Sequence, residues 1–235
     1  MELFSSFDAV VCVAREMPKA RPLEKAERAA PAGPEEIPAL LQVADGALGD
    51  GARTATVFGR RLAAGMSAFL LSRDGVPAAY VWAARGGYDI FPLRIRLTLP
   101  ERGAYLFDEA TIPKFRRQGL LGKLIRHAWE TLSLSEAAVC IREDNRSSLE
   151  ANGRLGFEPA SDIHIRRFGL LRRQDVVMRP GGARRRFWSR ATRGPNPRIL
   201  ECRIGAAEGR GIECSILPAA AATSRGASLE DSLPA

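Results

Sequence analysis

The sequence of 235 residues predicts an α/β fold, or a mixed α+β sheet. The main observation is the order of the patterns from residue 104 onward, which is strand, helix, strand, helix, strand. A β-hairpin is predicted upstream, over 67–84, because two apolar runs are joined through Asp74 and Gly75. No apolar run approaches the roughly 20 residues of a membrane-spanning helix. We therefore expect a globular, cytoplasmic protein.

The N-terminal half mixes strand and helix patterns. The β-branched run over 8–14 predicts a strand, and the segment 18–34, rich in Pro, Ala and charge, predicts a loop. Acidic residues in a first turn, with Gly46 just past the end, predict a helix from about 35 to 45. Further patterns predict a helix over 52–64, strands over 67–72 and 77–84, and a strand over 93–99.

The second half contains the most regular patterns. Apolar residues recur at intervals of three and four from Leu121 to Leu132, which predicts a helix over 119–133 with one buried face. Asn145 is placed to cap a short helix over 146–154. The remaining patterns predict strands over 104–111, 136–143 and 163–169.

The stretch FRRQGLLGKLI, residues 115–125, places Arg116, Arg117, Gln118 and Gly119 directly before a predicted helix. The first amides of a helix have no internal partners, and aligned peptide dipoles add about half a positive charge there. Arginine is therefore disfavoured at this end unless an anion binds. A phosphate or pyrophosphate would reverse the penalty, and a glycine lets backbone approach it closely. The alternative is that the arginines point into solvent around an ordinary loop glycine.

Two segments resemble motifs of the GNAT superfamily of N-acyltransferases. The first, ATIPKFRRQGLLGKLI, is similar to the family's strand, Pro-x-aromatic-Arg turn and Arg/Gln-x-x-Gly-x-Gly/Ala pyrophosphate loop. The second, NRSSLEANGRLGF, is similar to its Asn-x-x-Ala/Ser segment ending in Lys/Arg-x-Gly-Phe. The two lie in the family's order. The resemblance implies a central mixed, largely antiparallel sheet flanked by helices, and transfer of an acyl group from acetyl-CoA or another acyl-CoA to an amine.

By this resemblance, the backbone amides of 117–122 would bind the pyrophosphate of coenzyme A. The end of the preceding strand would present backbone groups to the pantetheine arm and the thioester carbonyl, and this strand would part from the next to admit them. Asn145 would face the arm, or would serve only as a helix cap. The cofactor-binding residues expected are Glu109, Ala110, Thr111, Arg116, Arg117, Gln118, Gly119, Leu120, Leu121, Gly122 and Asn145.

The catalytic residues expected from the resemblance are Asp108 and Asn152. An amine must lose its proton before it attacks the thioester, and a nearby carboxylate could accept that proton. Asp108 and Glu109 are the candidates, and because strand side chains alternate, only one of them can face the acceptor. Asp108 matches an acidic position of some family members and is preferred. Asn152 stands where the family often has a tyrosine acid, and an amide cannot deliver a proton.

The C-terminal part carries most of the charge. The net charge is +8, and residues 165–210 contain 13 arginines but three acids. We expect an acyltransferase domain over 1–170 and a basic, partly disordered extension over 171–235 that could pair as a hairpin over 199–217. Residues 171–198 suit a flexible arm for nucleic acid, an anionic membrane surface or an acidic partner. A solvated extension is the alternative.

Several functional questions stay open at this level. The four cysteines show no metal-binding spacing, so no metal is expected. The acceptor could be a small molecule or a protein amine, and a homodimer is one of the open oligomeric states. Two functions other than catalysis are also compatible with the sequence: a non-catalytic acyl-CoA-binding module and a tether that acts through the basic arm.

Overall fold

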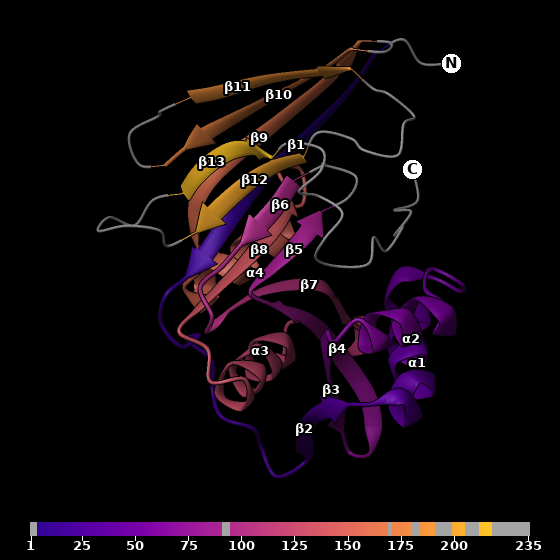
Figure 1. The fold of residues 1–235 in the computed structure, drawn as a ribbon. Helices are drawn as coiled ribbons and strands as arrows, with labels where there is room; N and C mark the ends of the chain where they lie inside the picture. The colour runs from indigo at the N-terminus through magenta and orange to yellow at the C-terminus, as the bar shows by residue number, and fades with distance from the viewer. Residues whose placement is uncertain are drawn as a thin grey trace.

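The structure is a computed structural model that describes residues 4–90, 95–168, 171–179, 184–190, 199–204 and 212–217. Its strands form a large central sheet and a smaller sheet, and its helices pack against the large sheet (Figure 1). The strands are β1 (Phe4–Ala14), β2 (Glu27–Ala32), β3 (Ser67–Arg73), β4 (Val76–Arg85), β5 (Gly87–Ile90), β6 (Ile95–Thr98), β7 (Gly103–Thr111), β8 (Glu136–Arg142), β9 (Glu158–Phe168), β10 (Leu171–Met178), β11 (Arg184–Arg190), β12 (Ile199–Ile204) and β13 (Ile212–Leu217). The α-helices are α1 (Ile37–Leu48), α2 (Ala55–Ala63), α3 (Leu120–Thr131) and α4 (Arg146–Leu155).

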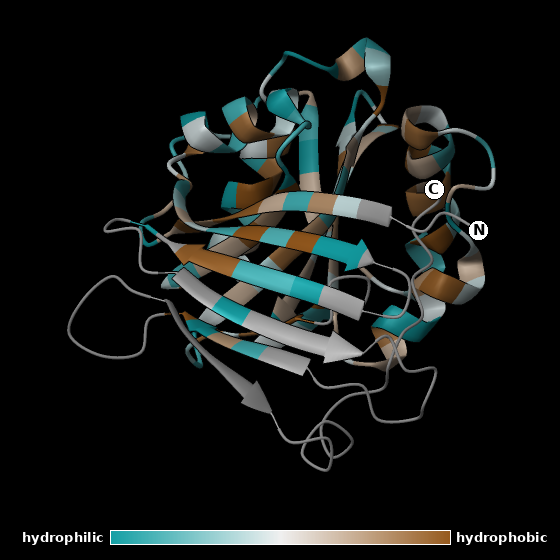
Figure 2. Cartoon of the chain, turned by 90° about the horizontal axis from the view of Figure 1, so that it is seen from above, coloured by the Kyte–Doolittle hydropathy of each residue, from teal (hydrophilic) through white to brown (hydrophobic). Residues whose placement is uncertain are grey.

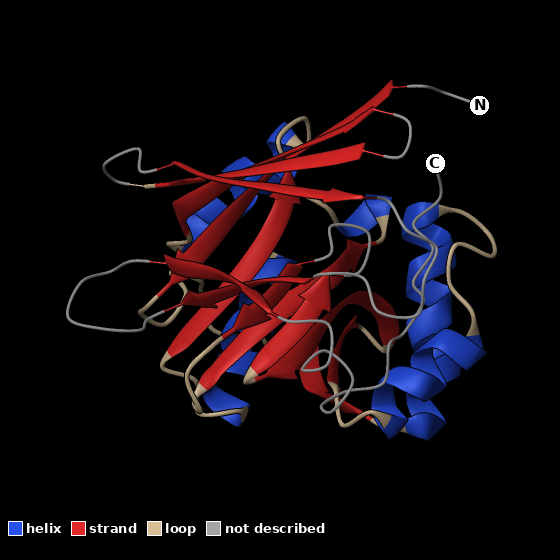
Figure 3. Ribbon diagram, turned by 45° about the horizontal axis from the view of Figure 1, so that its top comes forward, coloured by secondary structure: helices blue, strands red, loops and turns tan. Residues whose placement is uncertain are grey.

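The large sheet has nine strands in the order β11-β10-β9-β1-β8-β7-β4-β3-β2. Every neighbouring pair is antiparallel except β7 and β8, which run parallel. A smaller sheet has the order β13-β12-β6-β5, and the strands of the two sheets lie in layers (Figure 3). The predicted mixed, largely antiparallel sheet flanked by helices is therefore confirmed.

Helices cover both faces of the large sheet. Helices α1 and α2 pack on one face against Tyr80 and Trp82 of β4, and the smaller sheet packs on the same face against β1, β8 and β9. Helix α3 covers the opposite face. Along several strands, hydrophobic and hydrophilic residues alternate (Figure 2), as expected where the two faces of a strand meet different surroundings. No helix in the described ranges has the length and apolar character needed to cross a membrane.

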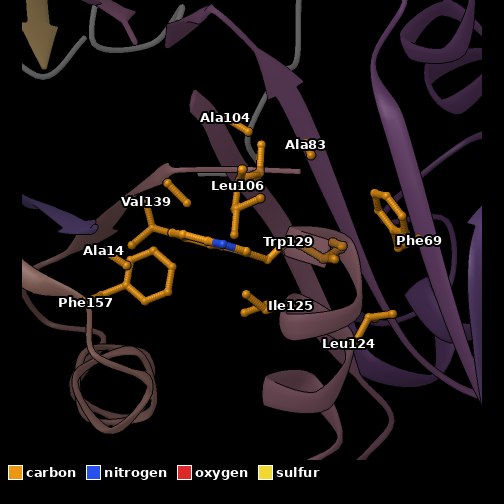
Figure 4. Close-up of a cluster of buried hydrophobic side chains, with 14 of the residues drawn as sticks. Ala14, Phe69, Ala83, Ala104, Leu106, Leu124, Ile125, Trp129, Val139 and Phe157 are labelled. Atoms are coloured by element: carbon orange, nitrogen blue, oxygen red, sulfur yellow. The ribbon is translucent and has the colours of Figure 1, made fainter. Parts of the chain in front are cut away.

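The largest hydrophobic cluster lies between α3 and the sheet. Trp129 of α3 is 5% exposed. It lies among Leu106 of β7, Val139 of β8 and Phe157, the residue directly before β9 (Figure 4). Because β7, β8 and α3 all contribute to this cluster, its packing fixes where α3 begins relative to the two strands.

In the N-terminal half of the chain, two strands were not predicted from the sequence. β2 lies inside the segment 18–34 that was expected to be a loop, and β5 follows the predicted hairpin without having been recognised. β2 has the sequence ERAAPA, without a β-branched or aromatic residue, and Pro31 cannot donate a ladder hydrogen bond. It forms as the edge strand beside β3, which supplies the pairing that its own sequence does not encode.

The C-terminal part differs from the flexible arm that was expected over 171–198. Its described residues form β10, which pairs with β9, and β11, which pairs with β10, so the large sheet continues past residue 170. Arg173 and Arg186 bind the buried carboxylate of Asp175 at 2.7 and 2.9 Å. The flexible-arm prediction is wrong for these two strands, because their backbones pair in the sheet and Arg173 and Arg186 bind Asp175 within it.

Farther along, β12 pairs antiparallel with β13, as a hairpin over 199–217 requires, and β12 also pairs with β6. The rest of 171–198, and the segment 218–235 that was expected to be disordered, lie outside the described residues.

Truncating Trp129 tests the packing of α3. We expect Trp129→Ala to lower the free energy of unfolding by about 3–5 kcal/mol, because a large buried side chain is replaced by a cavity. Met17→Ala is the control, because Met17 is 43% exposed and should change stability by less than about 0.5 kcal/mol. Urea unfolding measures both. Equal midpoints for the two variants would contradict the packing described.

Candidate functional site

The two parallel strands in the middle of the sheet separate after a short contact. β7 and β8 pair only at Gly103 with Glu136, Ala104 with Ala137 and Tyr105 with Ala138, although β7 continues to Thr111 and β8 to Arg142. Beyond Tyr105, β7 remains paired with β4, and β8 remains paired with β1. Beyond these three pairs, the backbone N–H and C=O groups on the facing edges of β7 and β8 cannot bond to the opposite strand and need other partners. This is the parting of strands that the resemblance implied.

A groove of about 1970 Å³ follows this gap. Its walls come from the facing edges of β7 and β8, the start of α3, one side of α4, the connection between α1 and α2, and β5. Every expected site residue except Asn152 lines it. The groove is thus continuous from the start of α3 to the far side of the gap.

The start of α3 points free amides at one end of the groove. Arg117 and Gly119 both have left-handed backbone, with φ of 63° and 73°, and the first helical hydrogen bond runs from Lys123 N to Gly119 O at 3.1 Å. Among the described residues, none accepts a backbone hydrogen bond from the amides of 117–122. Successive free amides in such a turn, with the positive end of a helix, form an anion-binding site.

The two glycines of this turn have different roles. A Cβ at Gly119 would meet nothing within 4 Å, so its positive φ, rather than space, favours glycine there. A Cβ at Gly122 would lie 2.6 Å from Leu155 Cδ2. Gly122 is therefore needed for close packing of α3 against the end of α4.

Two of the polar side chains before α3 form hydrogen bonds with neighbouring protein groups. Arg116 donates to the carbonyl oxygens of Thr111 and Ala47 at 3.0 and 3.1 Å. The amide of Gln118 accepts from Arg73 and donates to the carbonyl of Lys114. Both side chains therefore hold the turn in place, which corrects the expectation that the Arg116 side chain binds the anion. The contact expected of Gln118 is through its backbone amide, which has no backbone acceptor among the described residues. Arg117 is exposed at the groove and keeps its expected place.

Asn145 adopts the capping role that the sequence left as an alternative. Its Oδ1 accepts from Ser148 N at 3.2 Å and from Ser147 Oγ at 3.1 Å, at the start of α4. The residue also lines the groove, so the cap is part of its wall.

A β-bulge in β7 separates the two acidic candidates. Tyr80 pairs with Ala110 and Trp82 with Phe107, so Asp108 and Glu109 together stand opposite the single residue Val81. Asp108 has φ of 48°, an uncommon value for a residue other than glycine. The bulge directs Asp108 toward the face covered by α2, while Glu109 meets Asn152 of α4 on the other side.

Asp108 binds two arginines. Arg53 donates to it from Nη2 at 2.7 Å and Nε at 2.9 Å, Arg61 donates from Nη1 at 2.5 Å, and Tyr80 donates from its hydroxyl at 3.3 Å. Burial alone would raise the pKa of Asp108, but the two guanidinium groups outweigh it and hold the pKa below its ordinary value. A carboxylate this well stabilised is a poor base, so the preference for Asp108 is corrected.

Glu109 has the opposite environment. Burial raises the pKa of Glu109 to about 7, an effect that the neighbouring amide of Asn152 partly offsets. Its Oε1 is buried without a hydrogen-bond partner among the described residues. A carboxyl with a pKa near the working pH is suited to accept a proton, and this one lines the groove where the strands part. From its sequence, Glu109 was expected only as a backbone contact or as the second candidate for the base.

Asn152 lies beneath the groove rather than in it. The residue is 1% exposed, and its Nδ2 donates to Ser148 O at 3.1 Å. Its interaction with Glu109 makes it a support for that carboxyl. The expectation that residue 152 acts directly at the departing group is therefore corrected to a positioning role.

The far end of the groove has an aromatic wall that the sequence did not predict. Tyr88 of β5 stacks on Phe107 at 4.5 Å and on Tyr105 at 5.0 Å between ring centroids. All three rings line the groove, together with Asp89. β5 was not predicted, so Tyr88 had no expected position. The feature of the sequence that could have indicated one is an aromatic residue directly after the predicted hairpin.

Comparison with known proteins supports the architecture. No family model and no curated protein matches the sequence. An acetyltransferase of the GNAT family from Colwellia psychrerythraea has a TM-score of 0.51 and 17% identity, over 70% of this chain and 57% of the other. The chain has the GNAT fold. A functionally unknown conserved protein from Staphylococcus epidermidis is also similar in structure, with a TM-score of 0.51 and 11% identity, over 71% of this chain and 63% of the other.

Neutralising Asp108 tests its structural role. We expect Asp108→Asn to lower the free energy of unfolding at pH 7 by about 3–5 kcal/mol, because it leaves Arg53 and Arg61 without their carboxylate. The folded pKa of Asp108 is lowered, so its stabilisation is complete above the unfolded value near 3.9 and is lost as pH falls through the folded value. The difference from wild type should therefore narrow below about pH 4.

Asp144→Asn is the matched control, because Asp144 pairs with Arg142 on the surface, where both side chains are more than half exposed. Urea unfolding between pH 3 and 7 should leave this variant close to wild type. A difference between wild type and Asp108→Asn that stays constant over that range would contradict the role assigned to the Asp108 charge.

Proposed function

We propose that the protein is an N-acyltransferase that moves an acyl group, acetyl in the simplest case, from coenzyme A to an amine. The single observation that supports this most is the parting of β7 from β8 beside the free amides of α3, with the carboxyl of Glu109 in the gap. A diphosphate at the helix start and an extended thioester arm between the strands would satisfy both sets of free backbone groups.

The residues present are suited to acyl-CoA as co-substrate. The amides of 117–122, aided by Arg117, would bind the pyrophosphate. The free edge of β7 from Glu109 to Thr111 would hydrogen-bond the amides of the pantetheine arm, as an added strand does at an open sheet edge. The amine would enter from the side lined by Tyr88 and Phe107.

Glu109 would supply the base. An amine attacks only after it loses its proton, and the raised pKa of Glu109 lets its carboxylate accept that proton near neutral pH. Backbone amides beside the gap would stabilise the negative charge that develops on the carbonyl oxygen. The thiol of the departing group has a reference pKa near 8.5, so it leaves as a thiolate without a strong acid. Turnover is therefore compatible with asparagine at position 152.

Replacing Glu109 tests this assignment. We expect Glu109→Gln to lower kcat by about 10²- to 10⁴-fold, while acetyl-CoA still binds with nearly wild-type affinity, because the base is lost but the backbone contacts remain. In wild type, the rate should rise with pH through about 7 as Glu109 loses its proton, and the variant should lack this rise. Release of free thiol with a panel of amines measures the rate.

Glu101→Gln is the matched control, because Glu101 is an exposed acid outside the groove. It should keep both rate and pH profile. Tight binding of acetyl-CoA without thiol release from any amine, in wild type, would contradict catalysis and favour a binding module. A Glu109→Gln variant with unchanged rate and pH profile would contradict the role of Glu109 alone.

A further inference from the structure

The connection between β1 and β2 lies against the site rather than in solvent. Lys19 N donates to Leu155 O at the end of α4 at 3.1 Å, and Arg126 of α3 donates from Nη1 to Ala20 O at 3.0 Å. The connection therefore bridges the two helices at the phosphate end of the groove.

A buried ion cluster fixes the other end of this connection. Lys123 is 4% exposed, and its Nζ donates to Glu27 at 2.8 and 2.9 Å and to Glu24 at 2.8 Å. A buried charge satisfied by two carboxylates holds a defined geometry, because breaking it leaves an unpaired charge. The segment from Lys19 to Glu27 thus has fixed attachments at both of its ends.

The chain neighbours of three cations meet at Gly122, in the first turn of α3. Ala20 Cβ lies 3.4 Å from the place that a Cβ would take at Gly122, and Leu155 also meets that place. Lys19 and Arg21 flank Ala20 in the chain, and Arg154 precedes Leu155. These three cations come from two segments, are all exposed, and line the groove.

The charge at this end exceeds what a diphosphate alone requires. Among the charged residues that line the groove, those of the start of α3, of α4 and of the connection between β1 and β2 are Lys19, Arg21, Arg116, Arg117, Lys123 and Arg154, with Glu24 and Glu150 as acids. Lys123 is bound by Glu24 and Glu27, and Arg116 by two carbonyls, as described above. Lys19, Arg21 and Arg154 have no ion pair among the described residues, so their charges are available to a further anionic group.

We propose that Lys19, Arg21 and Arg154 bind a further phosphate of the same co-substrate, the 3′-phosphate of coenzyme A, so that the protein selects coenzyme A over its 3′-dephospho form. This inference rests on the proposed function. A phosphomonoester carries about −1.5 to −2 charge at pH 7 and three acceptor oxygens, which suits a small group of cations. Arginine adds paired hydrogen bonds to phosphate oxygens, and lysine adds a point charge.

Calorimetry with the full chain tests this, with coenzyme A and 3′-dephospho-coenzyme A as probes. Wild type should bind coenzyme A about 10-fold more tightly in 50 mM salt, and the advantage should shrink as salt screens exposed charges. Lys19→Gln with Arg21→Gln should weaken coenzyme A binding about 3- to 10-fold and leave the dephospho form within about 2-fold. Arg154→Gln should act in the same direction.

Arg28→Gln with Arg60→Gln is the matched control, because it removes the same charge from exposed sites outside the groove. It should leave both affinities and their ratio unchanged. Equal wild-type affinities for the two probes, or an equal loss for both in the Lys19 and Arg21 variant, would overturn the inference while leaving the proposed function intact. Absence of binding to either probe would overturn the proposed function, and this inference with it.

Discussion

The constraint on which the site depends is the early separation of two parallel strands. β7 and β8 share three residue pairs, and beyond them each strand is held on its outer edge, by β4 and by β1. Closing the gap would therefore require a change of register in the antiparallel ladders on both sides. Because α3 connects these two strands and packs on their common core, its free amides lie at the mouth of the same gap. The groove, the free amides at the start of α3 and the position of the Glu109 carboxyl therefore all depend on the separation of β7 from β8.

The bulge in β7 gives two adjacent carboxyls different tasks. One extra residue turns Asp108 toward Arg53 and Arg61, where its charge is stabilised. It leaves Glu109 in the gap, with its Oε1 buried and without a hydrogen-bond partner among the described residues. Their pKa values move in opposite directions from similar ordinary values. Asp108 then maintains the attachment of α2 to the sheet, while the proposed function assigns the proton transfer to Glu109. The strained backbone at Asp108 is stabilised by these ion pairs, as is common near functional sites.

Local patterns in the sequence predicted the parts of this arrangement that are themselves local. The apolar stripe of α3, the cap at Asn145 and the glycine at 119 are each determined by neighbouring residues. The roles of Asp108 and Glu109 were not predictable, because alternation assumes a regular strand and the bulge is set by pairing with β4. β2 likewise depends on β3, a partner distant in sequence, and the place of Lys19 depends on a contact with Leu155.

Hydrogen–deuterium exchange of the full chain, with and without acetyl-CoA, tests the central claim most directly. The account predicts slower exchange on binding for amides of 106–111 that face the gap and for those of 117–122 at the start of α3, with β9 to β11 unchanged. Unchanged exchange in these two segments at a saturating concentration of acetyl-CoA would contradict the claim that the separated strands and the helix start form the binding site.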